Sequence, residues 1–451
     1  MYMIYAVSII LVAVLLYQRY LINANNKIRH KISHDELTGL CNWNHFLHKA
    51  ELMLKNPGER YIICSNIADF KLINELFGRD KGNEILKRQA EIMIETASNN
   101  EVYGRRSDDK FVMIIDKADY DINKLKYCER QLQKLFDNSV YRMNLCFGIY
   151  EIKSDNKESI DSMCDKANIA IQSIKDNYQQ LVAFYDESLL TQALREQTIV
   201  GEFDEAVDNG EFQMYLQPQV SALNGEVIGS EALVRWVKND GTIVPPTEFI
   251  GIYEKTGIIY RLDRYMWEQA AIKLSEWKAE GITTNISVNI SVKDLYYVDI
   301  YKEFTGLVKK YNIDPHRLNI EITESFIMSD VPGIIHKLEK LQKAGFLVES
   351  DDFGSGYSSL NTLKDIKADV LKIDMGFLRE TENKQRSSAI LASIVNMAKR
   401  LNMSVITEGV ETESQVKFLT ELGCDMFQGY YYSKPVSVAE FEEKYFIKKA
   451  G

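Results

Sequence analysis

The second half of this chain repeats one unit eight times: a short run of strand-forming residues followed by a stretch of helical composition. The runs occupy residues 212–220, 226–236, 282–291, 317–325, 345–354, 368–375, 403–411 and 424–432. Eight such units in about 250 residues match a (β/α)8 barrel in number and length, so we expect a TIM-type barrel. A succession of separate Rossmann-like halves is the competing interpretation, but no G-x-G-x-x-G motif follows any of the runs.

Length and composition limit the number of domains, the class of partner and the type of metal site. At 451 residues the chain is too long for one ordinary core, so two or three domains are expected. The net charge of −11 and the lack of a long basic run weigh against a nucleic acid polymer as partner. The six cysteines and six histidines form no cluster with metal-ligand spacing. We therefore expect reduced, mostly buried thiols and no zinc site.

The amino-terminal stretch is apolar. Residues 3–16 are almost entirely apolar, and the run extends to residue 22 if Arg19 reaches the membrane surface. We predict a transmembrane helix over residues 1–22 and a short signalling stalk over residues 23–34, with a buried core helix as the alternative. Basic residues within 27–31 favour a cytoplasmic location for all that follows. The expected protein is single-pass in the inner (cell) membrane, with cytoplasmic catalytic domains.

Two cytoplasmic domains are expected after the stalk. Residues 35–185 alternate strand and helix patterns around a charged hairpin at residues 101–116, which predicts an α/β domain with an antiparallel-cored sheet. Residues 186–198 are expected to form a helical linker, and residues 199–451 the barrel domain.

Near the carboxyl end of strand after strand in the barrel region stands a side chain that can bind a metal or handle a proton. Barrel geometry brings all these strand ends to one face, so the groups can converge on one pocket. Each interrupts an apolar run, as in LNIEIT and VLKID, where a buried charge without a partner would be costly. The set is Glu231, Asn289, Glu321, Asp351, Asp352, Lys372, Glu408 and Gln428.

The chemistry of this set favours a metal-dependent phosphoesterase. Oxygen ligands without histidine or cysteine point to Mg²⁺ or Mn²⁺, and the number of carboxylates points to two ions. Two metals can activate a water and stabilise an in-line displacement at phosphorus. Lys372 could orient that water or neutralise phosphate charge. For any single acid, a helix N-cap or salt-bridge partner is the alternative; the convergence of the whole set favours the metal site.

The motifs around these residues resemble a known family. EALVRW (231–236) with QPQV ahead of it, SVNIS (287–291), EITES (321–325), SDDFGSGYSSL (350–360), LKID (371–374), ITEGVET (406–412) and QGYYYSKP (428–435) occur in one order over about 240 residues. Together they resemble an EAL-family cyclic di-GMP phosphodiesterase. The resemblance implies a barrel that hydrolyses cyclic di-GMP to linear pGpG with two Mg²⁺ or Mn²⁺ ions, in a homodimer.

The resemblance also implies a role for each matching residue. Lys372 falls on the position that holds the nucleophilic water, and Glu324 on the acid that braces the loop at residues 352–359. The substrate-contacting positions match Arg235, Gln217 and Asp374. The metal-binding positions match Glu231, Asn289, Glu321, Asp351, Asp352, Glu408 and Gln428, of which Glu231 and Glu408 are also expected to be catalytic.

The first cytoplasmic domain resembles a GGDEF diguanylate cyclase domain. The similarity rests on DELTGLCNWNHF (35–46), FKLINELFG (70–78), GNEIL (82–86) and on SDDKF (107–111) at the signature loop. The departures all weaken a nucleotide and metal site, because bulk and charge replace glycine and three acids are lost. They are Ser107 and Asp108 in place of glycines, Lys110 in place of an acid, Asn66 at the metal-binding aspartate and Asn83 at a guanine-reading acid.

These features lead to one main prediction and two alternatives. We expect a phosphodiesterase whose inactive GGDEF domain serves as a regulatory or dimerisation module. A cyclic di-GMP receptor that binds without hydrolysis is the first alternative, and a bifunctional cyclase and phosphodiesterase is the second. Whether the first domain binds GTP as an effector stays open, because Asn74 matches a guanine contact whereas Asn83 and Asp108 oppose tight binding.

Overall fold

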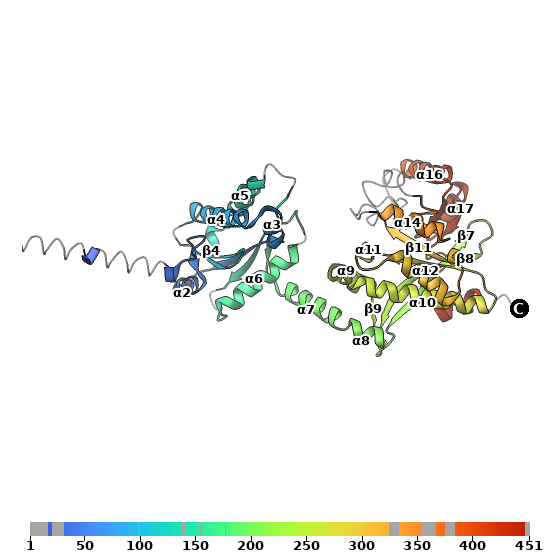
Figure 1. Ribbon diagram of the computed structural model, residues 1–451, viewed down its shortest axis with the longest axis horizontal. Coiled ribbons are helices and arrows are strands. Elements are labelled where there is room, and N and C mark those ends of the chain that lie inside the picture. The colour runs from blue at the N-terminus through green and yellow to red at the C-terminus, as the bar shows by residue number, and fades with distance from the viewer. Residues whose placement is uncertain are drawn as a thin grey trace, which may run out of the picture. The chain divides into compact units, whose positions relative to one another are not determined.

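The computed structural model describes residues 17–19, 31–98, 100–136, 141–153, 156–175, 177–323, 333–353, 367–374 and 384–446 (Figure 1). The chain divides into two compact units, residues 1–195 and 196–451. Helix α7 (Glu187–Gly201) contains the predicted linker of residues 186–198 except for Asp186, and it includes the point of division.

The first unit contains a six-stranded sheet in the order β1-β3-β4-β2-β5-β6. Its central strand, β2, pairs antiparallel with β4 and β5, as the predicted antiparallel core requires. Both edge strands, β1 and β6, pair parallel with their neighbours. The strands are β1 (Cys41–Asn42), β2 (Arg60–Ile67), β3 (Val102–Ser107), β4 (Lys110–Asp116), β5 (Leu145–Ile152) and β6 (Val182–Phe184).

Helices cover both faces of this sheet, so its middle strands are apolar on both sides. Alternate residues of β2 belong to two different hydrophobic clusters, with Ile62 and Cys64 in one and Tyr61 and Ile63 in the other. All six cysteines of the chain are buried, as expected. The helices of this unit are α2 (Trp43–Leu54), α3 (Phe70–Phe77), α4 (Arg79–Glu95), η1 (Lys117–Asp119), α5 (Ile122–Gln133), η2 (Lys134–Phe136) and α6 (Ile160–Ile174).

The second unit contains a closed barrel of eight strands, β7, β8 and β10 to β15, which the pairing of β7 with β8 closes. Two short strands, β9 and β16, extend the sheet beyond this ring. The strands are β7 (Phe212–Ser221), β8 (Val227–Val237), β9 (Ile243–Val244), β10 (Asn285–Ile290), β11 (Leu318–Thr323), β12 (Val348–Phe353), β13 (Val370–Ile373), β14 (Ser404–Thr407), β15 (Met426–Phe427) and β16 (Val436–Ser437).

One strand departs from the regular (β/α)8 barrel that the repeats predict. Strand β7 runs antiparallel to both of its barrel neighbours, β8 and β15. The reason is local: only residues 222–226 join β7 to β8, with Gly225 at a φ of 71°, and so short a connection can return the chain only in the opposite direction. The other barrel strands pair parallel to one another.

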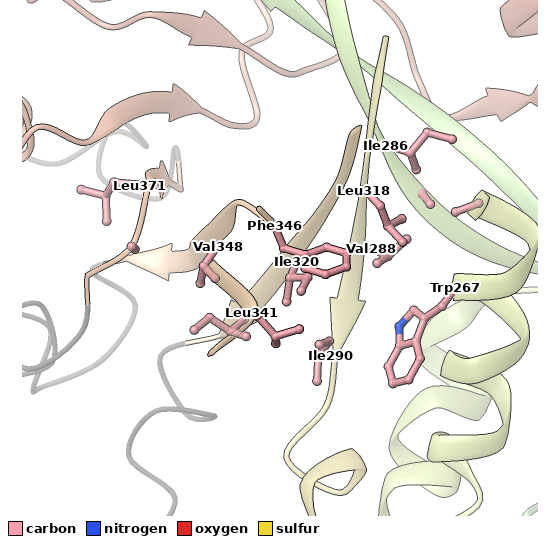
Figure 2. Close-up of a cluster of buried hydrophobic side chains, with 14 of the residues drawn as sticks. Trp267, Ile286, Val288, Ile290, Leu318, Ile320, Leu341, Phe346, Val348 and Leu371 are labelled. Carbon is pink, nitrogen blue, oxygen red and sulfur yellow. The ribbon is translucent and has the colours of Figure 1, made fainter. Parts of the chain in front are cut away.

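Helices packed against the outside of the barrel explain why its strands alternate apolar and polar residues. Ile286, Val288 and Ile290 of β10 belong to one apolar cluster with residues of β11 and with Trp267 of α10, and Figure 2 shows them beside one another. The residues between them therefore face the barrel interior. The helices are α8 (Phe203–Asp208), α9 (Pro246–Thr256), α10 (Ile259–Ala279), α11 (Asp294–Tyr297), α12 (Ile300–Tyr311), η3 (Pro315–Arg317), α14 (Ile334–Lys343), α16 (Lys384–Arg400), α17 (Glu413–Glu421) and α18 (Val438–Tyr445).

The predicted membrane anchor is not supported. Across the described residues, no helix combines the length and the apolar character needed to cross a bilayer. The predicted span over residues 1–22 and stalk over residues 23–34 lie outside these residues, except for 17–19 and 31–34. The prediction of a single-pass membrane protein was therefore wrong on this evidence. Its weak point is physical, since the nearly uninterrupted apolar run at residues 3–16 is shorter than the roughly 20 residues that a bilayer requires.

Candidate active site

Lys372 of β13 lies at the centre of a buried cluster of charged side chains. Its ammonium group forms ion pairs with four carboxylates, at 2.7 Å from Glu408, 3.4 Å from Glu231 and 3.5 Å from Asp351, and with Glu321 as well. The lysine is completely buried. One buried cation therefore faces four acids, of which Glu231 and Glu321 are buried and Asp351 and Glu408 partly exposed.

Five different segments deliver these side chains. Glu231 lies in β8, Glu321 in β11 and Asp351 in β12, whereas Glu408 directly follows β14. The backbone N–H of Glu408 donates to the carbonyl of Ile373, which fixes the end of β14 against β13. One carboxylate oxygen each from Glu231, Glu321 and Glu408 lies within 4.8 Å of the other two, a spacing that could hold a metal ion.

Amide side chains complete the cluster on the Glu231 side. Asn289 donates from Nδ2 to Oε1 of Glu231 at 3.3 Å, and Gln428 donates from Nε2 to Oε2 of the same residue at 2.5 Å. Gln428 Nε2 also lies 3.2 Å from Oε1 of Gln217, which in turn donates to the carbonyl of Ser433. Both carboxylate oxygens of Glu231 are thus held by amide side chains, one from β10 and one directly after β15.

Burial and mutual repulsion raise the pKa values of two acids in the cluster, Glu408 and Glu321. Burial raises the pKa of Glu408 to about 8, with Asp351 and Glu231 adding to the shift and Lys372 opposing it. Burial and then the neighbouring Glu231 raise the pKa of Glu321 well above its ordinary value. For Lys372 burial alone would lower the pKa, but the surrounding carboxylates, led by Glu231 and Glu321, raise it well above its usual range. The site is short of positive charge, which a divalent cation would supply.

Two oxygen atoms test whether the cluster suits a metal. Among the described residues, neither Oε2 of Glu321 nor Oε1 of Gln428 has a hydrogen-bond partner, although both are buried. Carboxylate and amide oxygens are ligands that Mg²⁺ and Mn²⁺ accept. The donor set therefore fits a divalent cation.

Of the four remaining predicted residues, the structure describes the side chains of two, Arg235 and Asp374. Arg235, four residues beyond Glu231 in β8, donates to the carbonyl of Val234 at 2.8 Å, and its guanidinium carbon lies 5.7 Å from the ring centroid of Tyr215. Asp374 directly follows β13 and is half-buried. Glu324 lies outside the described residues, and so does the side chain of Asp352, whose backbone belongs to β12.

A cavity of about 590 Å³ adjoins the cluster and contains acids that the sequence patterns did not single out. Arg235 and Asn289 line it together with Glu254 and Asp263. Burial and the adjacent Asp294 raise the pKa of Asp263 well above its ordinary value. Asp263 and Glu254 were missed because they lie on helices α10 and α9 and not at strand ends. The sequence does contain one sign of this site: the acid Asp263 directly follows Leu262, which belongs to the apolar face of α10.

The hairpin of the first unit is held by contacts within its turn and with neighbouring segments of the same unit. Arg105 donates two hydrogen bonds to the carbonyl of Asp108, which has a positive φ of 42°, and pairs with Asp35 at 2.9 Å. Oδ2 of Asp109 accepts a hydrogen bond from the backbone N–H of Ile67 at 2.8 Å. Arg105 thus stabilises the turn, and the carboxylate of Asp109 ties it to the end of β2.

Family models match a segment in each of the two units. Residues 200–435 match the EAL domain model and residues 32–180 match the model "Diguanylate cyclase, GGDEF domain". The chain is 28% identical to "Signaling protein YkoW" of Bacillus subtilis and 29% identical to "Bifunctional diguanylate cyclase/cyclic di-GMP phosphodiesterase MucR" of Pseudomonas aeruginosa, each over 92% of its length. It spans only 53% and 62% of those relatives.

A solved structure extends the comparison to three dimensions. The PaMucR phosphodiesterase in complex with c-di-GMP is 33% identical and superposes with a TM-score of 0.51, over 54% of this chain and 99% of that one. The EAL model alone accounts for residues 200–435 of the 451. The predicted resemblance is therefore confirmed: this chain belongs to the EAL domain family and carries a GGDEF domain in tandem with its EAL domain.

Proposed function

We propose that this chain is a cyclic di-GMP phosphodiesterase that hydrolyses its substrate to linear pGpG. The observation that carries the proposal is the convergence of four carboxylates on the buried Lys372 inside the barrel. The EAL family match and a relative whose name includes cyclic di-GMP phosphodiesterase support it. The adjoining cavity supplies room beside Arg235 for part of a nucleotide substrate.

The proposed site holds two divalent cations, Mg²⁺ or Mn²⁺. Four acids outnumber the single lysine, and buried oxygens of Glu321 and Gln428 lack hydrogen-bond partners within the described part of the chain. Ions bound there supply activation of a water and neutralisation of charge at phosphorus. The proposed ligands are Glu231, Asn289, Glu321, Asp351, Asp352, Glu408 and Gln428.

The chain's own residues position the reactants. Lys372 donates hydrogen bonds from Nζ to the attacking water, and Arg235 binds an oxygen of the phosphate. The water oxygen forms a bond to phosphorus as the bond from phosphorus to the 3′ oxygen breaks, and a proton from the water ends on that 3′ oxygen. The product therefore keeps its phosphate at the 5′ end. Gln217 and Asp374 contact the substrate, and Glu324 braces the loop at residues 352–359.

Incubation of the purified chain with cyclic di-GMP tests the proposal. We expect metal-dependent conversion to pGpG, followed by chromatography, in Mg²⁺ or Mn²⁺ and none in the presence of a chelator. Calorimetry with the same preparation measures substrate binding separately. Substrate that binds but stays intact with both metals would favour the alternative, a receptor that does not hydrolyse its ligand.

The GGDEF domain is proposed to be an inactive regulatory or dimerisation module. Ser107 ends β3 and Asp108 begins the turn, and Asn66 lies near the end of β2, at the position that the resemblance assigns to a metal-binding aspartate. Measuring the rate of pGpG formation during a titration with GTP distinguishes an effector site from a purely structural domain. Light scattering on the same sample checks the proposed homodimer.

Replacing Lys110 with glutamate is not expected to restore diguanylate cyclase activity. The substitution returns one acid, but the side chains of Ser107 and Asp108 remain where a triphosphate would approach the backbone, and Asn66 still replaces a metal ligand. Incubation of the variant with GTP and Mg²⁺ should yield no cyclic di-GMP by chromatography. Because the phosphodiesterase would consume any product, the assay uses the double variant with Glu231→Ala. Cyclic di-GMP made by that protein would show that the domain has lost far less than its sequence indicates.

A further inference from the structure

A second set of polar side chains lies inside the barrel next to the proposed metal ligands. Its members are Ser287 of β10, Asn319 of β11 and Glu349 of β12, which we call the polar triad. Each stands two residues before a proposed ligand, namely Asn289, Glu321 and Asp351. Residues two apart in a strand project from the same face, so the triad and these ligands share the barrel interior.

One carboxylate oxygen joins the triad. Oε1 of Glu349 accepts a hydrogen bond from Oγ of Ser287 at 3.0 Å and another from Nδ2 of Asn319 at 2.7 Å. Strands β10, β11 and β12 are consecutive in the sheet, so the side chain of Glu349 reaches past β11 to β10. A single residue thus links the three strands that deliver Asn289, Glu321 and Asp351.

The triad is almost fully buried, which makes its polar composition costly. Ser287, Asn319 and Glu349 are 0%, 4% and 1% exposed. Val288, Ile320 and Val348, the apolar neighbours of the triad in these strands, belong to one hydrophobic cluster with residues of α10 and α14, and Figure 2 shows their side chains near one another. Apolar side chains could fill the interior at lower cost in desolvation. Retention of a carboxylate there calls for a role other than stability.

We propose that Glu349 is a positioning residue for the divalent-cation site. Its hydrogen bonds to Ser287 and Asn319 fix β10, β11 and β12 relative to one another, and thereby fix Asn289, Glu321 and Asp351. The inference rests on the proposed function, since it takes those three residues to be metal ligands. Groups that orient metal ligands typically contribute about 10–100-fold to metal affinity.

A geometric role makes a prediction about metal selectivity. Mg²⁺ demands nearly ideal octahedral geometry, whereas Ca²⁺ accepts six to eight oxygen ligands in flexible arrangements. Looser placement of the three strands should therefore weaken the binding of Mg²⁺ more than the binding of Ca²⁺. A loss of overall stability alone would not change the ratio of the two affinities.

The test compares Glu349→Leu with Glu349→Gln in the full chain. The leucine variant loses both hydrogen bonds, whereas the amide oxygen of glutamine can still accept them. Bound Mn²⁺ is measured by electron paramagnetic resonance, and Mg²⁺ and Ca²⁺ are added as competitors. We expect the leucine variant to bind Mg²⁺ about 10–100-fold more weakly, with a smaller loss for Ca²⁺, and the glutamine variant to stay within about 3-fold of the unmodified chain.

Two further variants separate the loss of ligand positioning from a failure to fold and from a general loss of stability. Ser287→Ala removes one of the two hydrogen bonds and should give an intermediate loss of Mg²⁺ affinity even if Glu349→Leu fails to fold. Ile320→Val, on the helix-facing side of β11, should lower the unfolding temperature without changing the ratio of Mg²⁺ to Ca²⁺ affinity. Equal losses in the glutamine and leucine variants, or unchanged metal binding in both, would overturn the proposal. Failure of the unmodified chain to bind Mn²⁺ would instead overturn the proposed function.

Discussion

Replacing Glu231 with alanine is expected to abolish turnover, with kcat/KM lower by at least about 10³-fold, which corresponds to about 4 kcal/mol of lost transition-state stabilisation. The residue interacts with Lys372 at 3.4 Å and accepts hydrogen bonds from Asn289 and Gln428. Its removal deletes a proposed metal ligand and the carboxylate that accepts hydrogen bonds from Asn289 and Gln428, although Gln428 keeps Gln217 as an acceptor. Steady-state hydrolysis of cyclic di-GMP measures the effect.

The control for this variant is Glu443→Ala. Glu443 is exposed on α18 and belongs to the same unit, so its loss removes one carboxylate without touching the barrel interior. Its kcat/KM should match that of the unmodified chain. Substantial activity in the Glu231 variant, with the control unchanged, would remove Glu231 from the catalytic set.

Replacing Lys372 with methionine is expected to lower kcat by about 100-fold while the substrate Kd changes by only a few fold. Nζ of Lys372 is proposed to hold the attacking water, so its loss affects the reaction more than binding. The four carboxylates around it also lose their only paired cation among the described residues. Breaking a buried ion pair by removing one partner costs about 3–5 kcal/mol, so the free energy of unfolding should fall by that amount.

Divalent cations separate the two effects of this substitution. Mg²⁺ or Mn²⁺ should restore much of the stability, because either ion neutralises the uncompensated acids, but neither should restore kcat. Thermal unfolding with and without metal measures the first effect. The control is Lys417→Met, since Lys417 pairs with Glu413 on the exposed surface of α17 and should be replaceable without effect. An unchanged kcat in the Lys372 variant would remove the proposed role in holding water.

Much of the active site could be anticipated because barrel topology is regular. In the segment LNIEIT, apolar Leu318 and Ile320 alternate with polar Asn319 and Glu321, and a strand places the two sets on opposite faces. Helices cover one face, so the polar set must point into the barrel. The same rule brings Glu231 and Lys372 together although 141 residues separate them.

Other features depended on contacts that no local pattern reveals. Asp263 and Glu254 lie on helices, where a single acid ordinarily indicates a solvent-exposed face, and only the cavity beside Arg235 gives them significance. Glu349 also lies outside the set of residues that the sequence motifs indicated, although it precedes Asp351 by only two residues. Its hydrogen bonds to Ser287 and Asn319 come from two other strands, so they exist only once β10, β11 and β12 lie side by side.

The order of the chain's residues was enough to identify the two domains, the eight barrel strands and the acids that converge on Lys372, because spacing and alternation dictate which face a side chain occupies. The antiparallel direction of β7 follows from a connection to β8 of only five residues. The predicted membrane anchor was not supported, because no helix among the described residues is long and apolar enough to cross a bilayer. Tertiary structure alone decided the electrostatics of the site. The raised pKa of Glu408 and the shortage of cations around four acids arise from distances between strands that are far apart in sequence.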